Sequence, residues 1–443
     1  MRPDNMDAFH RERLREFGSF ENELLLQNHA VLKDFGALAP EGADPDDLIT
    51  NISEVEYSRA SRVQLPALNA LHLWCTICGV QPTSQWIAPS EEAPEPEDHT
   101  QLWKYFTQAY RILLWCALGY VSLVDCFIAK EQTSGAWAQV AIVLSVSLAC
   151  AASFVLARRI LEADVLNSRI VQAIRNSSDP ERTIGQISAS IYVSLAFAVL
   201  VAAAGAAADF LDSSSYANDP TSPIFLRLNT GGIFFYRLGS ILVQLQVSVG
   251  ICLFAVLVRV LRLKASSTYE LLTTYEDQTS VARALKRFID IDICVSHASH
   301  KYSFQILIIF LGFFLKFLLC ALYHVTENVK EKFVSRTQFG PAQILDMLVQ
   351  PGMVCVFGLV ILGQLNQEID DLIHATARFA LRQRSKPKHD RKLIKEFQTY
   401  VKYGVFYFRI YGFVCYLSTA SKFVAVAFST YILLLRFKRW GIL

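Results

Sequence analysis

Charged side chains are scarce in this chain. Only 19% of its 443 residues are Asp, Glu, Lys or Arg, whereas 53% are hydrophobic, and the net charge is +2. A soluble protein of this length normally carries more charge and fewer long apolar runs. With a net charge near zero, we also expect no nucleic-acid partner.

Arrangements of residues that carry out catalysis are missing too. The sequence has no glycine loop that would cradle a phosphate, no nucleophile beside a base and no cluster of metal ligands. Cys75 and Cys78 form a lone Cys-x-x-Cys pair, but a structural zinc needs a second pair and redox chemistry needs a βαβ context. We therefore predict no enzymatic activity, no catalytic residues, no metal and no cofactor.

The N-terminal region contains little apolar sequence. Residues 1–26 have no apolar core of the usual length, so a cleavable signal is not expected. We predict that residues 1–100 form a cytoplasmic region with an acidic, proline-rich linker at 89–99. A moderately apolar segment at 65–80 is too short to span a bilayer, and we predict a helix at the membrane surface there.

Long apolar runs dominate the rest of the chain. A bilayer core about 30 Å thick needs roughly 20 apolar residues in a helix. Seven runs approach this length, at residues 107–129, 136–157, 188–210, 234–258, 304–323, 343–363 and 410–435. Because a helix satisfies its own backbone hydrogen bonds in lipid, we predict an all-α, multi-pass protein of the plasma membrane. Its seven-helix transmembrane domain is expected at 101–437.

The distribution of Lys and Arg predicts how these helices are oriented. Cytoplasmic loops carry an excess of both residue types. The second, fourth and sixth connections between the runs hold most of them, whereas the odd-numbered connections hold only Lys130, Arg227, Lys330, Lys332 and Arg336. The N-terminus is therefore expected inside and the C-terminus outside, which is the reverse of a G-protein-coupled receptor.

The connections expected inside are long and show helical periodicity. Residues 266–291 are expected to continue the fourth helix, residues 365–383 to continue the sixth, and residues 389–408 to form another helix before the seventh. We predict that cytoplasmic extensions at 259–303 and 364–408 pack the subunits together. The alternative, solvated loops with helical character, remains open.

The last apolar run carries polar residues along one helical face. At 100° per residue, five side chains fall within about 40° of one line. They are Ser418, Lys422, Ala425, Ser429 and Arg436, which we call the polar stripe. A charge inside an apolar helix generally faces protein or water. The stripe therefore predicts either a helix that lines an aqueous pore or one that buries its polar groups against a neighbouring helix.

Residues beside the polar stripe have predicted roles as well. Ile432 and Leu433 lie on its shoulders, and an apolar ring of such residues closes a pore by dewetting. We predict that these two form a gate. Thr430 and Tyr431 lie off the stripe and are expected to pack against other helices.

The end of the chain resembles the signature of the invertebrate gustatory-receptor family, which is related to insect odorant receptors. In that family a Gly-Phe pair stands near the start of the last helix, followed by Thr-Tyr, five apolar residues and Gln-Phe. The matching residues are Gly412, Phe413, Thr430, Tyr431 and Phe437. The stretch at 67–82 also resembles the family's leucine-rich stretch ending Gly-hydrophobic-x-Pro.

Two departures from this signature point to a divergent, non-insect member, such as a nematode one. Four apolar residues stand where the family has five, and Arg436 replaces Gln. One deleted residue rotates the rest of a helix by about 100°. A ring of positive charges at Arg436 or Lys422 would repel cations.

The resemblance implies a function. It implies a chemosensory, ligand-gated cation channel, homotetrameric or assembled with related subunits, whose last helices line a central pore. The alternative is a seven-transmembrane G-protein-coupled chemoreceptor, which a cytoplasmic C-terminus would favour. A transporter would need broken helices or an internal repeat, and the sequence shows neither.

Ionisable residues near the expected outer ends of the spans predict a small-molecule site. They come from five helices and are Asp125, Asp209, Arg237, Lys316, His324 and Asp346. An ionisable residue inside a membrane is a functional-site hypothesis by default. Aromatic residues on the fifth run complete the predicted pocket: Phe313, Phe314, Phe317 and Tyr323. Charges at span ends also snorkel to the headgroups, and this alternative remains open.

Overall fold

Long helices make up nearly all of the chain that the structure describes. The computed structural model describes residues 66–80, 97–132, 136–162, 165–175, 177, 179–217, 230–274, 281–327, 349–383 and 407–440. All of them belong to one of the two units into which the chain divides, Leu65–Leu443. The unit Met1–Gln64 lies outside the described residues, as do residues 89–96 of the linker predicted at 89–99. Residues 97–99 are not linker but the first residues of helix α4, Glu97–Gln132.

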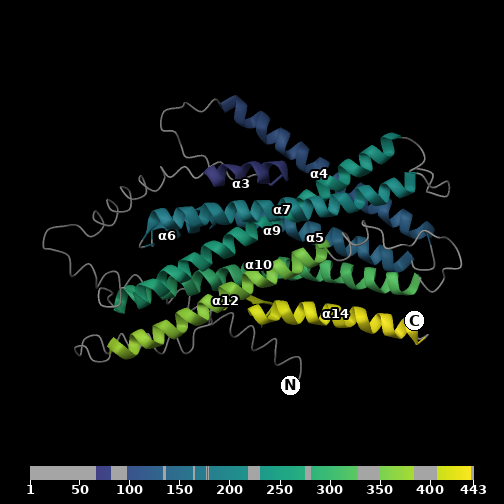
Figure 1. The fold of residues 1–443 in the computed structure, drawn as a ribbon. Coiled ribbons are helices and arrows are strands. Elements are labelled where there is room, and N and C mark those ends of the chain that lie inside the picture. Colours follow the sequence, from purple (N-terminus) through teal and green to yellow (C-terminus); the bar gives the residue numbers. More distant parts are fainter. Residues whose placement is uncertain are drawn as a thin grey trace, which may run out of the picture. The chain divides into compact units, whose positions relative to one another are not determined.

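Each of the seven predicted runs corresponds to a long helix. These helices are α4 (Glu97–Gln132), α5 (Ala136–Glu162), α7 (Pro180–Ala217), α9 (Thr230–Thr273), α10 (Val281–Glu327), α12 (Gln350–Gln383) and α14 (Leu417–Arg439). In the part of the chain that the structure describes, six of these helices are long and apolar enough to cross a membrane. Helix α4 adds a shorter apolar stretch, Gln108–Val124. The predicted all-α, multi-pass fold class is confirmed. Figure 1 shows these helices running side by side.

Helix α9 is the centre of this unit. It packs against α4, α5, α7, α10 and α12, and 83% of its most apolar segment is buried. Residues 247–258 within it contain no charge and are almost entirely apolar around the whole circumference. A helix of this composition is expected where neighbours surround it on all sides.

Small residues allow α5 to lie close to its neighbours. A Cβ atom at Gly250 of α9 would lie 2.3 Å from the Ser153 carbonyl oxygen of α5, and one at Gly312 of α10 would lie 2.7 Å from the Ser145 carbonyl oxygen. The buried Ser153 hydroxyl donates to the Val247 carbonyl oxygen over 2.7 Å. Close backbone approach through small residues is a common way to hold membrane helices together.

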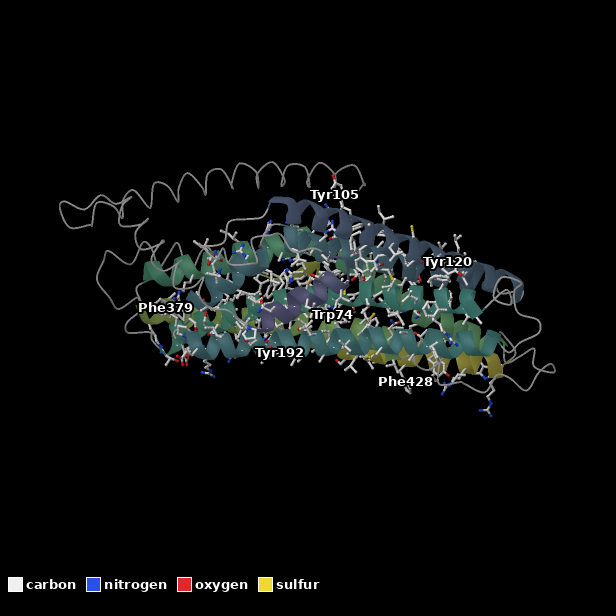
Figure 2. The ribbon with its side chains drawn as sticks, turned by 90° about the horizontal axis from the view of Figure 1, so that it is seen from above. Trp74, Tyr105, Tyr120, Tyr192, Phe379 and Phe428 are labelled. Atoms are coloured by element: carbon white, nitrogen blue, oxygen red, sulfur yellow. The ribbon has the colours of Figure 1, made fainter. Side chains whose placement is uncertain are left out.

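A short helix, α3 (Pro66–Ile77), forms in the segment predicted to lie on the membrane surface. Ala67, Leu71 and Cys75, spaced four residues apart, form a buried face that packs on α7. Gly79 follows with a positive φ of 72°, a conformation that favours glycine just beyond a helix end. Figure 2 looks onto this helix, with Trp74 near the middle of the view. Its position at a membrane surface stays a prediction.

The helices continue beyond the apolar runs at one end of the bundle. Residues 365–383 continue α12, as predicted, but the prediction that residues 266–291 continue one helix was wrong. Helix α9 ends at Thr273, and residues 281–291 belong to α10. Thr273 and Thr274, where α9 ends, are β-branched residues of a kind that disfavours helix interiors. The short helix α6 (Val165–Arg175) lies at the same end (Figure 1).

The last helix begins later than predicted. Strands β1 (Arg409–Ile410) and β2 (Phe413–Val414) form an antiparallel hairpin before it. The turn residues Tyr411 and Gly412 both have positive φ angles, 51° and 89°, which suit a two-residue hairpin turn and are incompatible with an α-helix. Gly412 and Phe413 of the family signature therefore lie in this hairpin and not in the last helix. The helix predicted at 389–408 lies outside the described residues except for its last two.

Candidate functional site

Helix α14 is the least buried of the described helices that could span a membrane. Only 6% of its most apolar segment is buried, compared with 39% to 83% for the corresponding segments of the other five helices. It packs against α12 and α10 at the edge of the bundle (Figure 1). The described part of the chain therefore leaves one long face of α14 uncovered.

The inward face of α14 follows helical spacing. Ala420 is buried, and Phe423, Ala427, Thr430, Tyr431, Leu434 and Phe437 are half-buried. At 100° per residue these side chains lie opposite the polar stripe. The ring of Phe423 contacts that of Phe314 on α10, with centroids 5.3 Å apart.

The polar stripe points away from the rest of the chain. Ser418, Lys422, Ala425, Ser429 and Arg436 are all exposed. Among the residues that the structure describes, no helix of the same chain buries the stripe. Helical spacing predicted the stripe from the sequence, but it could not predict which way the stripe faces.

Apolar side chains flank the polar stripe on both sides. Val426 and Leu433 lie on one side, and Phe428 and Ile432 on the other. All four are exposed, from 38% for Ile432 to 64% for Phe428. Figure 2 shows Phe428 at the edge of the bundle. The predicted gate residues Ile432 and Leu433 thus lie on the uncovered face.

A cavity of about 400 Å³ lies between α10, α12 and α14. Its aromatic lining consists of Phe313, Phe314 and Phe317 from α10 and of Phe423, Phe428 and Tyr431 from α14. On α12, Pro351, Gly352, Cys355 and Val356 complete the wall. The structure thus brings Phe313 and Phe317, both predicted as ligand residues, together with Tyr431 of the last helix.

Lys316, predicted to be part of the same pocket, does not line this cavity. It is 4% exposed, and its Nζ donates to the Gln350 Oε1 of α12 over 3.0 Å. Gln350 donates in turn to the Gln244 Oε1 of α9 over 2.5 Å. A Cβ at Gly205 of α7 would lie 2.3 Å from that same oxygen, so the glycine leaves room for the chain of polar groups. Hydrogen bonding of this kind is what a buried charge requires.

Of the other ionisable residues predicted for the pocket, Arg237 is the one whose side chain the structure describes. Arg237 of α9 stacks on the Phe210 ring of α7, with its guanidinium carbon 3.9 Å from the ring centroid, a cation–π geometry. Asp125 and His324 belong to α4 and α10, but their side chains lie outside the described ones. Asp346 lies outside the described residues altogether.

Sequence reasoning missed Asn366, which holds the connection into α14. This buried side chain of α12 donates to the Phe408 carbonyl oxygen over 3.0 Å and to the Cys415 carbonyl oxygen over 2.8 Å. Its own oxygen accepts from the Phe408 N–H over 2.8 Å. The available signal in the sequence was the position of this Asn, directly after a largely apolar stretch. We call this set of bonds the Asn366 clamp.

Two further contacts fix the start of α14. A Cβ at Gly363 of α12 would lie 2.6 Å from the Leu417 backbone nitrogen, so the first residue of α14 rests directly on that glycine. The Ser299 hydroxyl of α10 donates to the Arg409 carbonyl oxygen over 2.8 Å. The hairpin is therefore held between α10 and α12, and the position of α14 depends on both helices.

A tyrosine just before the hairpin also binds to α12. The Tyr407 hydroxyl donates to the Asp370 Oδ1 of α12 over 2.5 Å. Burial raises the pKa of Tyr407, and the Asp370 carboxylate raises it further. The hydroxyl therefore stays protonated, and remains a donor, throughout the physiological pH range.

Comparison with known proteins identifies the fold. No family model matches the chain, and no curated protein sequence matches it significantly. Among solved structures, the insect olfactory receptor OR5 from Machilis hrabei in complex with eugenol aligns with a TM-score of 0.58 at 14% identity, over 83% of this chain and 97% of the receptor. The chain has the insect olfactory receptor fold. A second structure of OR5 from Machilis hrabei is 15% identical over the same shares, with a TM-score of 0.49.

The insect olfactory receptor fold agrees with the coarse part of the sequence resemblance, the relation to insect odorant receptors. It is a nearly all-helical, multi-pass fold, as the apolar runs predicted. The gustatory type and the nematode affinity stay predictions.

We expect Asn366→Ala to loosen the start of α14. The substitution removes the partners of one N–H and two carbonyl groups, and each buried polar group left unpaired costs about 1–3 kcal/mol. The Tm of the purified full chain should therefore fall by several degrees. Asn69→Ala, on an exposed position of α3, is the matched control and should leave the Tm unchanged. Equal Tm values for the two variants would contradict the clamp.

Proposed function

We propose that this protein is a chemosensory receptor of the plasma membrane that acts as a ligand-gated ion channel, with the last helices of several copies lining the pore. The observation that carries the proposal is the outward-facing polar stripe of α14. A charged side chain such as Lys422 is costly in lipid. The stripe is therefore stable in a membrane only where it faces water or another protein.

The flanks of the polar stripe support an assembly around an axis. In a closed ring of copies, the stripes face the axis and the exposed apolar flanks pack between neighbours. Ile432 and Leu433, both exposed, would then narrow the pore from the shoulders of each stripe. Four copies follow from the sequence resemblance, and the predicted orientation puts the N-terminus inside and the C-terminus outside.

The small-molecule ligand is proposed to bind inside the helix bundle, next to α14. The cavity of about 400 Å³ falls within the range of roughly 300–1,000 Å³ that is typical of ligand pockets. Three of its aromatic residues belong to α14, so a ligand there touches the pore helix directly. Lys316 and its hydrogen-bonded glutamines supply a polar site nearby on α10 and α12.

The fold likeness favours neither a G-protein-coupled receptor nor an enzyme. The matching structure is an insect olfactory receptor, which argues against the G-protein-coupled alternative and against an enzyme. OR5 was solved with eugenol, and eugenol is therefore the first probe for this chain.

Recordings in planar bilayers test the channel. The purified chain should show unitary currents and assemble to four times its mass of 49.8 kDa. In a KCl gradient, the double variant Lys422→Gln, Arg436→Gln should shift the reversal potential towards greater cation permeability, because positive charges in a narrow pore repel cations.

Arg378→Gln, an exposed position on the α12 extension, is the control for this measurement and should keep the wild-type reversal potential. A wild-type chain without currents, or an unchanged reversal potential in the double variant, would count against a pore lined by α14.

Filling the cavity tests the ligand site. Gly352 lines it, and a Cβ there meets nothing within 4 Å, so Gly352→Leu should occupy cavity space without a clash. Eugenol should raise the Tm of the wild-type chain, because a ligand that binds only the folded state stabilises it. Most of that rise should disappear in Gly352→Leu. Gly185→Leu, equally open and on α7, should retain it; the reverse pattern would place the ligand elsewhere.

A further inference from the structure

A second group of charged side chains lies at the end of the bundle where α5, α6 and α10 approach one another. Arg159 stands near the end of α5, Arg169 on α6, and Lys301 on α10 directly before its apolar run at 304–323. The segment of α5 that is apolar enough to cross a membrane, Val143–Leu161, also ends near Arg159. By sequence these cations lie at the level where a membrane changes from apolar chains to headgroups.

At the centre of this group is a buried tyrosine. Tyr302 is 0% exposed, and its hydroxyl has no hydrogen-bond partner among the described residues. The Lys301 Nζ lies over its ring, 5.8 Å from the centroid, and Arg169 and Arg159 both interact electrostatically with Tyr302. A buried hydroxyl without a partner is costly in a native fold and calls for an explanation such as a missing ligand.

The two arginines have neutral hydrogen-bond partners. Arg159 donates to the Lys301 carbonyl oxygen over 3.5 Å. It also donates to the Gln305 side-chain oxygen over 2.6 Å when the Gln305 amide is oriented so that its oxygen and nitrogen both have partners. Arg169 donates to the Gln172 Oε1 over 3.0 Å. None of the three forms an ion pair with a carboxylate among the described residues.

A neighbouring cation shows the contrast. Lys264 of α9, which is 3% exposed, forms an ion pair with Asp290 of α10. It also lies 3.5 Å from the Gln172 Oε1 that accepts from Arg169. The buried cation of this region is thus neutralised within the chain, whereas the three around Tyr302 are not.

We propose that Arg159, Arg169, Lys301 and the Tyr302 hydroxyl bind a phosphate group. The hydroxyl and the guanidinium groups supply hydrogen-bond donors, and the three positive charges match the charge of the phosphate, whose oxygens accept several charge-assisted hydrogen bonds. To bind the phosphate, the two arginines would give up only neutral partners. This site lies outside the proposed pore and ligand cavity.

The phosphate has two possible sources. The position at the ends of the membrane helices fits the headgroup of an anionic lipid. A soluble phosphate presents the same chemistry to the same donors. The experiment therefore needs one arm for each source.

Thermal unfolding of the full chain in lipid nanodiscs tests the proposal without any measurement of current. Phosphatidic acid added to phosphatidylcholine should raise the Tm of the wild-type chain. If inorganic phosphate in plain phosphatidylcholine gives the same rise, the source is soluble and the site stands. No rise with either probe overturns the proposal.

Tyr302→Phe separates a binding role from a structural one. The hydroxyl has no partner in the free chain, so the variant should keep the wild-type Tm in phosphatidylcholine alone. Its affinity for the phosphate probe should nevertheless fall at least about tenfold, as expected for a lost hydrogen bond to a charged group. Tyr192→Phe, an exposed tyrosine of α7, is the control and should bind as the wild type does. Unchanged affinity in Tyr302→Phe would contradict the site.

A charge variant provides the second test. The triple variant Arg159→Gln, Arg169→Gln, Lys301→Gln should lose most of the Tm rise caused by the phosphate probe. Arg182→Gln, an exposed arginine at the start of α7, should retain it. If the triple variant responds like the wild type, the cluster does not bind phosphate.

Discussion

The cost of a charge in lipid is the constraint on which the rest of this structure depends. Seven helices of an apolar chain are expected in a bilayer, and the last of them exposes Lys422 and Arg436 along one face. Lipid cannot stabilise that face, and the helices that the structure describes do not cover it. Under the proposed function, further copies packed around α14 complete this face.

Helix α12 connects the separate parts of the proposed receptor. One end of it supplies Gln350 to the buried polar chain and Gly352 to the cavity wall. Further along, Gly363 and Asn366 hold the start of α14. A ligand that changes the packing of α12 against α14 would thus act on the pore helix through direct contacts. A ligand shifts such an equilibrium only by its difference in affinity for the two states.

Much of the architecture was predictable from the sequence because lipid imposes strict rules. Length and hydropathy set the helices, and a period of 3.6 residues set the polar stripe of α14. The hairpin before α14 was not predictable, because Ile-Tyr-Gly-Phe reads as the start of an apolar helix and nothing marks Tyr411 for a positive φ. The partners of Lys316 and Asn366 were not predictable either. They are separated from these residues by 34 positions or more in the chain, and only the fold brings them together.

The direction in which the polar stripe faces is tested most directly by its access to water. Single cysteines at Ser429, on the stripe, and at Leu434, on the packed face, would be treated in the assembled full chain with a charged, water-soluble thiol reagent, with the unmodified chain as background. A pore lined by α14 predicts rapid modification of Ser429→Cys and protection of Leu434→Cys. Protection of Ser429→Cys, or equal modification at both positions, would contradict it.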